Sequence, residues 1–174
     1  ENNGTWEENP YADFGTSCHH GAENYIKTRE LKIDEAMAKF DSLLEQNSAK
    51  YSDTTMSRLR KQYSVSTNEE FFVVYRQKIH DILIELPSFM DTSFPAWETV
   101  NAEEFLYEQI PGDTVRFKGY VDAVIKHTNK HGKQQVWLID WKTCGWGWTV
   151  DQKRDPMKQM QLGLYKIYYA AKHG

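Results

Sequence analysis

The chain is poor in cysteine and has no long hydrophobic run, and both absences limit what it can be. Its 174 residues include only Cys18 and Cys144, too few for a disulfide framework or for a four-cysteine zinc or iron–sulfur site. No apolar stretch approaches the roughly 20 residues that cross a bilayer, and the first residues lack the pattern of a secretory signal. We therefore expect a cytoplasmic protein without a membrane partner and without an iron–sulfur cluster in this chain.

The chain also lacks an excess of positive charge. It carries 21 Lys and Arg residues against 25 Asp and Glu residues, for a formal net charge of −4. This argues against a protein that coats nucleic acid by bulk charge, but it leaves room for an enzyme with a local basic groove. The length and a hydrophobic content of 40% predict a single domain over residues 1–174, with residues 1–13 as an N-terminal arm.

Helical spacing of apolar residues dominates the first half of the chain. It predicts helices over residues 16–30 and 33–46, which form a helical hairpin, and a short helix within residues 48–65. Thr67-Asn68-Glu69-Glu70 matches a capping box, so a long helix is expected to follow and to end at Pro87. Gly21 lies inside the first helix and indicates close packing or a distorted turn.

Alternating sequences replace this pattern after Pro95. Residues 99–110, 114–127 and 134–142 predict three strands in hairpin order, because turn-forming residues separate them. Helical spacing resumes at residue 155 and continues to Gly174. The order of elements predicts an α/β fold with a mixed, mostly antiparallel central sheet flanked by helices.

Two carboxylates and a lysine are expected to meet on this sheet. Asp140 and Lys142 are two residues apart on a predicted strand and therefore share a face, and pairing of the strands brings Asp122 beside Asp140. Paired carboxylates bind one or two Mg²⁺ or Mn²⁺ ions, which polarise a phosphodiester and activate a water molecule. Lys142 could orient that water or stabilise charge on phosphorus. A charged pair at an exposed hairpin edge is the plainer alternative.

Further motifs occur in a fixed order around these residues. They are Gly119-Tyr120-Val121-Asp122, Leu138-Ile139-Asp140-Trp141-Lys142-Thr143, Gln161-Leu162-Gly163-Leu164-Tyr165 and, upstream, Gly15-Thr16-Ser17-Cys18-His19-His20-Gly21-Ala22-Glu23. With them the chain resembles the PD-(D/E)XK nuclease superfamily, in particular its RecB-like, phage-type exonuclease branch, from about Phe14 to Tyr169. The resemblance implies a restriction-endonuclease-like core.

The same resemblance implies roles for individual residues. Asp122 and Asp140 would be metal ligands together with the Trp141 carbonyl, and Lys142 would be the catalytic lysine. His19 would complete the metal shell from the first helix, with the adjacent His20 as an open alternative.

Residues of the last helix belong to the same implied site. Gln161 and Tyr165 lie on one helical face, being four residues apart, and would orient the active site or contact DNA. Ordinary helix packing is the alternative for both.

A third acidic residue and a possible DNA-contacting segment remain open. The branch usually has an acidic residue on the strand before Gly119, and Glu104 shares its parity with apolar neighbours and should point inward. Glu103 is its rival, and either side chain could simply be solvated.

The segment after the catalytic lysine suits stacking on unpaired bases and holding phosphates, although its tryptophans could instead cap the core. It contains Trp146, Trp148, Lys153 and Arg154.

We therefore expect a metal-dependent DNA nuclease, an exonuclease acting on linear ends or single strands. The alternatives are a structure-selective or restriction-type endonuclease, an inactive nucleic-acid-binding module of the same fold, and an aromatic-rich domain for a ligand such as carbohydrate. Phage recombination, DNA repair and defence all use such nucleases. The fold commonly continues past the Gln-X-X-X-Tyr helix, so a chain truncated at its C-terminus is also an expectation.

Overall fold

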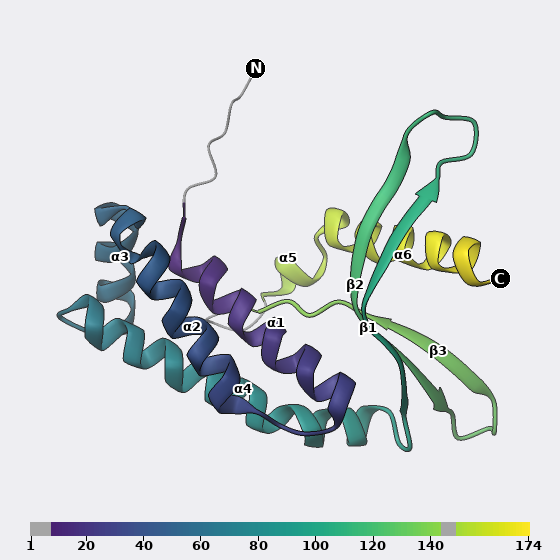
Figure 1. Cartoon of the computed structure of the whole chain (residues 1–174), viewed down its shortest axis with the longest axis horizontal. Helices are drawn as coiled ribbons and strands as arrows, with labels where there is room; N and C mark the ends of the chain where they lie inside the picture. Colours follow the sequence, from purple (N-terminus) through teal and green to yellow (C-terminus); the bar gives the residue numbers. More distant parts are fainter. Residues whose placement is uncertain (1–7, 144–148) are drawn as a thin grey trace. The chain divides into compact units, whose positions relative to one another are not determined.

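A computed structural model describes residues 8–143 and 149–174 of the chain (Figure 1). The described residues divide into two compact units. The helical unit contains residues 8–25 and 30–87, and the sheet unit contains residues 26–29, 88–143 and 149–174. The expected single domain over residues 1–174 stays a prediction, and each unit is described by itself.

The helical unit holds the predicted helices of the first half. They are α1 (Pro10–Thr28), α2 (Ile33–Asn47), the 3-10 turn η1 (Ser48–Lys50), α3 (Asp53–Tyr63) and most of α4 (Asn68–Ser93). The predicted arm over residues 1–13 is wrong for residues 10–13, because α1 already begins at Pro10, where proline is tolerated in a first turn. Asp13 is buried and accepts hydrogen bonds from Asn47 Nδ2 and the Tyr51 hydroxyl.

The core of the helical unit explains the glycine inside α1. Helix α4 buries Phe71, Tyr75, Ile79 and Leu83, one on every helical turn. A Cβ atom at Gly21 would lie 2.5 Å from Leu83 Cδ1, and 3.0 Å from Cβ of a residue in α2. The close packing that the sequence indicated is confirmed.

Helix α4 does not end at Pro87 as predicted but continues to Ser93. A proline inside a helix removes one hydrogen bond and disfavours the preceding turn by about 3 kcal/mol. Leu86 and Met90, which lie on either side of Pro87, are both buried and continue the helical spacing of the buried residues of α4. Burial of these side chains outweighs the local preference of proline.

The sheet unit contains the three predicted strands in antiparallel hairpin order. They are β1 (Glu98–Gln109), β2 (Arg116–Thr128) and β3 (Gln134–Ile139), with β2 in the centre. The chain is thus α/β as expected, and the sheet formed by the described residues is antiparallel throughout rather than mixed. Strand β3 ends three residues earlier than predicted, so Asp140 and Lys142 follow the strand instead of lying within it.

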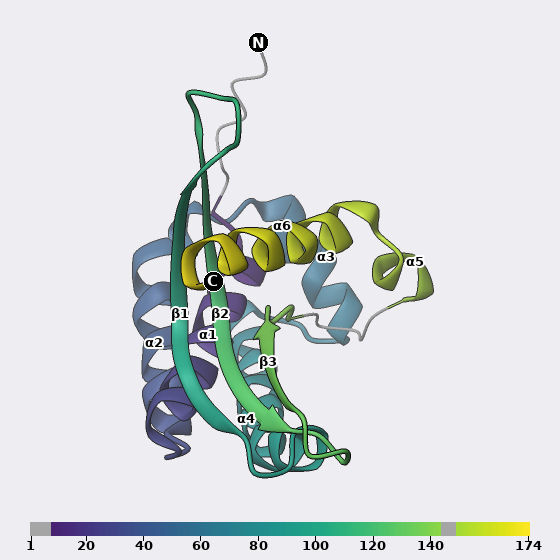
Figure 2. The same ribbon diagram turned by 90° about the vertical axis from the view of Figure 1, so that its right-hand side faces the viewer.

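Two helices complete the sheet unit. The short α5 (Val150–Lys153) was not predicted, whereas the predicted final helix is confirmed as α6 (Pro156–His173). Helix α6 lies across β1 and β2 (Figure 2), and Tyr165 and Tyr168 pack there with Leu106, Val121 and Val124. Among the described residues, none of the helices has the length and apolar character that a bilayer crossing requires.

Candidate metal and phosphate site

The register of the sheet brings Asp122 to the end of β3. Ala123 of β2 pairs with Ile139, the last residue of β3, so the next position on β2, Asp122, faces Asp140. The Asp122 carboxylate accepts a hydrogen bond of 2.6 Å from the backbone nitrogen of Trp141. This bond holds the carboxylate at the segment that contains both Asp140 and Lys142.

Asp140 and Lys142 form an ion pair beside this hydrogen bond. Lys142 Nζ lies 2.7 Å from Asp140 Oδ2, and the Asp140 side chain is only 7% exposed, whereas that of Lys142 is 34% exposed. The buried carboxylate is thus paired with an amine that solvent or a ligand can reach. The three residues expected to carry the chemistry come together at one end of β3, although their roles stay predictions.

The predicted pair on α6 reaches the same place. Gln161 Nε2 lies 2.8 Å from the Tyr165 hydroxyl and 3.5 Å from Asp140 Oδ1. Tyr165 is buried, and a Cβ atom at Gly119 would lie 2.7 Å from its Cε1. The glycine of β2 therefore makes room for the tyrosine ring, and the tyrosine hydroxyl supports the glutamine that approaches Asp140.

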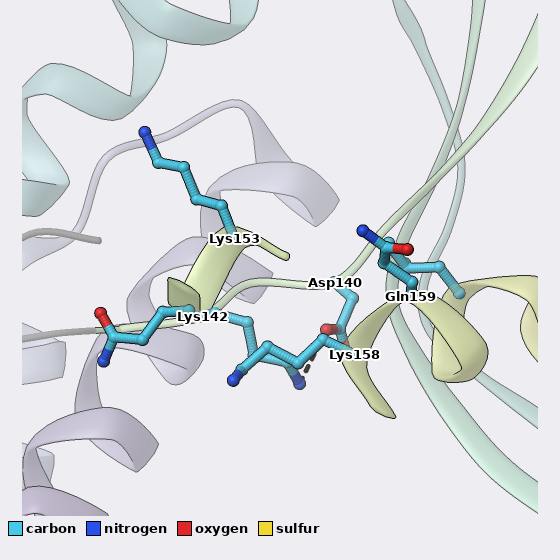
Figure 3. Close-up of a pocket in the computed structure, with 7 residues that line it drawn as sticks. Asp140, Lys142, Lys153, Lys158 and Gln159 are labelled. Carbon is cyan, nitrogen blue, oxygen red and sulfur yellow. Dashed lines mark ion pairs between the residues drawn. The ribbon is translucent and has the colours of Figure 1, made fainter. Parts of the chain in front are cut away.

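A pocket of about 380 Å³ opens beside Asp140 and is mostly basic or amide-bearing. It is lined by Asp140, Lys142, Gln152, Lys153, Lys158, Gln159 and Leu162. Figure 3 shows the amino groups of Lys142 and Lys158 directed toward one region next to Asp140, whereas Lys153 points away. Cationic and amide side chains around one opening suit the binding of a phosphate group.

Lys158 was not among the residues predicted from the sequence. It lies in the first turn of α6, and its Nζ is 2.6 Å from Asp155 Oδ2. A hydrogen bond from Lys158 is the main cause that lowers the pKa of Asp155. The sequence feature that could have identified Lys158 is its spacing of three residues from Gln161, which places both residues on one helical face.

The segment between Lys142 and α6 is described only in part. Trp146 and Trp148, expected to stack on bases, lie outside the described residues, as does Cys144. Lys153 lines the pocket. Arg154 is exposed at the end of α5 and is not one of the lining residues.

Glu104 is buried as expected, with 4% of its surface exposed, and its carboxylate contacts Asn101 and the last turn of α6. Its carboxylate accepts a hydrogen bond of 2.7 Å from Lys172 Nζ, lies 2.8 Å from His173 Nε2 and also binds Asn101. Burial raises the pKa of Glu104, but these three partners outweigh it and hold the pKa at about 2. Glu104 thus joins β1 to the last turn of α6, and its part as a metal ligand stays a prediction.

The rival Glu103 has an unusual backbone. It is exposed and adopts a φ of 59°, which few residues other than glycine adopt. It lies between the pairs Ala102–Ala123 and Glu104–Val121, so Asp122 is its neighbour on β2. Strained backbone positions of this kind often cluster at functional sites.

The two candidate histidines lie on α1 in the helical unit. His20 Nε2 is 3.3 Å from Asn24 Nδ2, one helical turn further on. Because His19 belongs to the helical unit, its part in a metal shell with Asp122 and Asp140 stays a prediction. Within residues 8–143 and 149–174, no group of three His, Cys, Asp or Glu side chains suited to a metal ion is found.

A comparison with protein-family models, with curated proteins and with solved structures found no match for this chain. The resemblance to the nuclease superfamily therefore rests on the sequence motifs alone and stays a prediction.

Proposed function

We propose that this chain is a metal-dependent deoxyribonuclease with a restriction-endonuclease-like core. In this proposal Asp122 and Asp140 are metal ligands and Lys142 is the catalytic lysine. One observation carries it: the Asp122 carboxylate is hydrogen-bonded to the backbone between Asp140 and Lys142, which are themselves 2.7 Å apart. A charged pair at an exposed edge would not need a second carboxylate from the neighbouring strand.

The donor atoms fit Mg²⁺ or Mn²⁺. Two carboxylates and the Trp141 carbonyl are hard oxygen ligands, which these ions prefer over the sulfur and nitrogen ligands typical of zinc. The bond from Trp141 N–H to Asp122 ties the residue that bears this carbonyl to the first carboxylate. A bound divalent ion supplies a Lewis acid that polarises the phosphodiester and lowers the pKa of water.

The protein's own groups then position the substrate. Lys142 is accessible and next to Asp140, so its amine can orient the attacking water or stabilise the charge that develops on phosphorus. Gln161, supported by Tyr165, approaches Asp140 and restricts the rotamer of that carboxylate. Lys158 offers a second cation for a phosphate in the adjoining pocket.

End-dependent cleavage is the finer part of the proposal. It rests on the resemblance to the RecB-like branch, with linear ends or single strands as the preferred substrate. A structure-selective or restriction-type endonuclease would use the same centre. An inactive nucleic-acid-binding module would keep the same side chains without turnover.

Incubation with linear and circular DNA tests these proposals together. The full chain is incubated with each DNA in Mg²⁺, in Mn²⁺ and in EDTA, and the products are resolved on a gel. We expect loss of linear DNA in either metal ion, intact circles, and no cleavage in EDTA. Cleavage of circles would replace the exonuclease by an endonuclease, and the absence of metal-dependent cleavage of both DNAs would refute the enzyme.

A further inference from the structure

Three aromatic rings lie together on the surface of the β1–β2 hairpin. Phe105, Tyr107 and Tyr120 are 41%, 49% and 46% exposed, although aromatic side chains of this size are usually buried. Phe105 stacks on Tyr107 with ring centroids 6.0 Å apart and packs against the tilted ring of Tyr120 with centroids 4.9 Å apart. The rings support one another, and each remains partly exposed.

Positively charged side chains lie beside two of these rings. The Arg116 guanidinium lies 5.1 Å from the Tyr107 ring centroid, and Lys118 Nζ lies 5.9 Å from that of Tyr120. Lys118 is also the direct cross-strand partner of Tyr107. We call these five residues the aromatic strip: Phe105, Tyr107, Arg116, Lys118 and Tyr120.

The aromatic strip leads toward the candidate metal ligands. Alternate residues of a strand lie on one face, so Arg116, Lys118 and Tyr120 share the exposed face of β2, and Asp122 is two residues further along the same strand. At the rise of a β-strand, Arg116 and Asp122 are about 20 Å apart. Along β2 the two cations Arg116 and Lys118 thus precede the carboxylate of Asp122.

We propose that the aromatic strip binds single-stranded DNA and guides it toward Asp122. Exposed rings stack on unpaired bases, and cations beside them bind the phosphates between those bases. A duplex hides the faces of its bases, so the rings favour a single strand. A protein partner would use the rings but would not need a cation beside each of two rings. The guidance of the strand to Asp122 rests on the proposed nuclease function, whereas the binding of single-stranded DNA to the aromatic strip does not.

Binding is measured by fluorescence anisotropy on the full chain. The probe is a labelled oligothymidylate of about 12 nucleotides, within the range that one binding domain covers, and EDTA prevents cleavage. We expect Tyr107→Leu and Phe105→Leu to raise Kd about fivefold or more, the loss of one stacked base. Their effect should not depend on salt.

Substitution of the two cations should instead change the salt dependence of binding. Arg116→Ala and Lys118→Ala should each reduce the slope of log K against log salt by about 0.7, the value for one phosphate contact on a single strand. Phe89→Leu and Lys130→Ala are the matched controls, since Phe89 is 52% exposed on α4 and Lys130 is exposed in the β2–β3 turn. Neither control should alter Kd or the slope.

Three results would overturn the proposal. They are an unchanged Kd in both ring variants, an equal loss of affinity for a duplex of the same length, and a ring-dependent self-association in sedimentation that leaves DNA binding intact. The assay contains no divalent ion, so its outcome is independent of turnover. If the chain binds the strand through its rings but never cleaves DNA, the proposed nuclease function is refuted and the proposed binding by the aromatic strip still holds.

Discussion

Tyr165 lies so close to Gly119 that a side chain at position 119 would collide with its ring, since a Cβ atom there would be 2.7 Å from Tyr165 Cε1. We predict that Gly119→Ala lowers the free energy of unfolding by about 1–3 kcal/mol, the range of overpacked cores, and slows DNA cleavage because Tyr165 supports Gln161. Urea unfolding and cleavage rates measure both. Gly163→Ala is the control: no atom lies within 4 Å of its added Cβ, so the substitution should stabilise α6 by about 0.5–1 kcal/mol.

The Tyr165 hydroxyl is expected to matter through Gln161. Tyr165→Phe keeps the ring but removes the group that lies 2.8 Å from Gln161 Nε2. Since groups that orient metal ligands contribute roughly 10- to 100-fold, we expect cleavage to slow by about tenfold or more, with kcat reduced and KM for DNA little changed. Tyr168→Phe, whose ring stacks on Phe117, should retain activity. Equal effects of the two substitutions would indicate general packing instead.

Lys158 is expected to bind a phosphate in the pocket beside Asp140. Lys158→Ala should raise KM for DNA and reduce the salt dependence of binding by about one phosphate contact. Its kcat at saturating DNA should stay near that of the wild type. Lys166→Ala, a lysine on α6 that lines a different pocket, serves as the control. A variant at position 158 with unchanged KM would remove that residue from the substrate site.

Glu104 should make stability depend on acidity. Its pKa of about 2 lies below the ordinary value of 4.5, so its contribution is fully present above about pH 4.5 and is lost as the pH falls toward 2. The contribution is on the order of 3 kcal/mol. Urea unfolding of the wild type and of Glu104→Gln should differ at neutral pH and converge in acid. A constant difference across this range would show that the ion pairs with Lys172 and His173 contribute little.

Local patterns predicted most of the secondary structure. Turn-forming residues such as Gly112 and Gly132, which adopt φ values of 79° and 76°, delimit the strands, and alternation along β1 predicted that Glu104 is buried. The spacing of Asp140 and Lys142, with the antiparallel pairing of β2 and β3, also indicated where three charged groups would meet.

Other features depend on contacts that no local pattern contains. Pro87 lies inside α4 because burial of Leu86 and Met90 continues the helix core. On α6, Met160 and Ile167 are apolar residues but are exposed, whereas Tyr165 and Tyr168 are buried against the sheet. Helical spacing is compatible with either face, and the space beside Gly119 favours the tyrosines.

The role of Glu104 could not be predicted from its strand alone. Parity indicated a buried carboxylate beside the site, yet its partners Lys172 and His173 come from the end of α6, 68 and 69 residues further on. Lys158 reaches Asp140's pocket in the same way, through the packing of α6 on the sheet. Long-range packing thus determined the surroundings of both side chains.

The most direct test of the catalytic centre is the rate of Mg²⁺-dependent cleavage of linear DNA by Lys142→Ala. Since Lys142 is 34% exposed and not part of the core, the variant should fold, as circular dichroism can verify. Its cleavage rate should fall by at least about 100-fold, as when one charge-stabilising group is removed from an active site, while Lys130→Ala retains full activity. Cleavage by Lys142→Ala at the wild-type rate would contradict the centre formed by Asp122, Asp140 and Lys142.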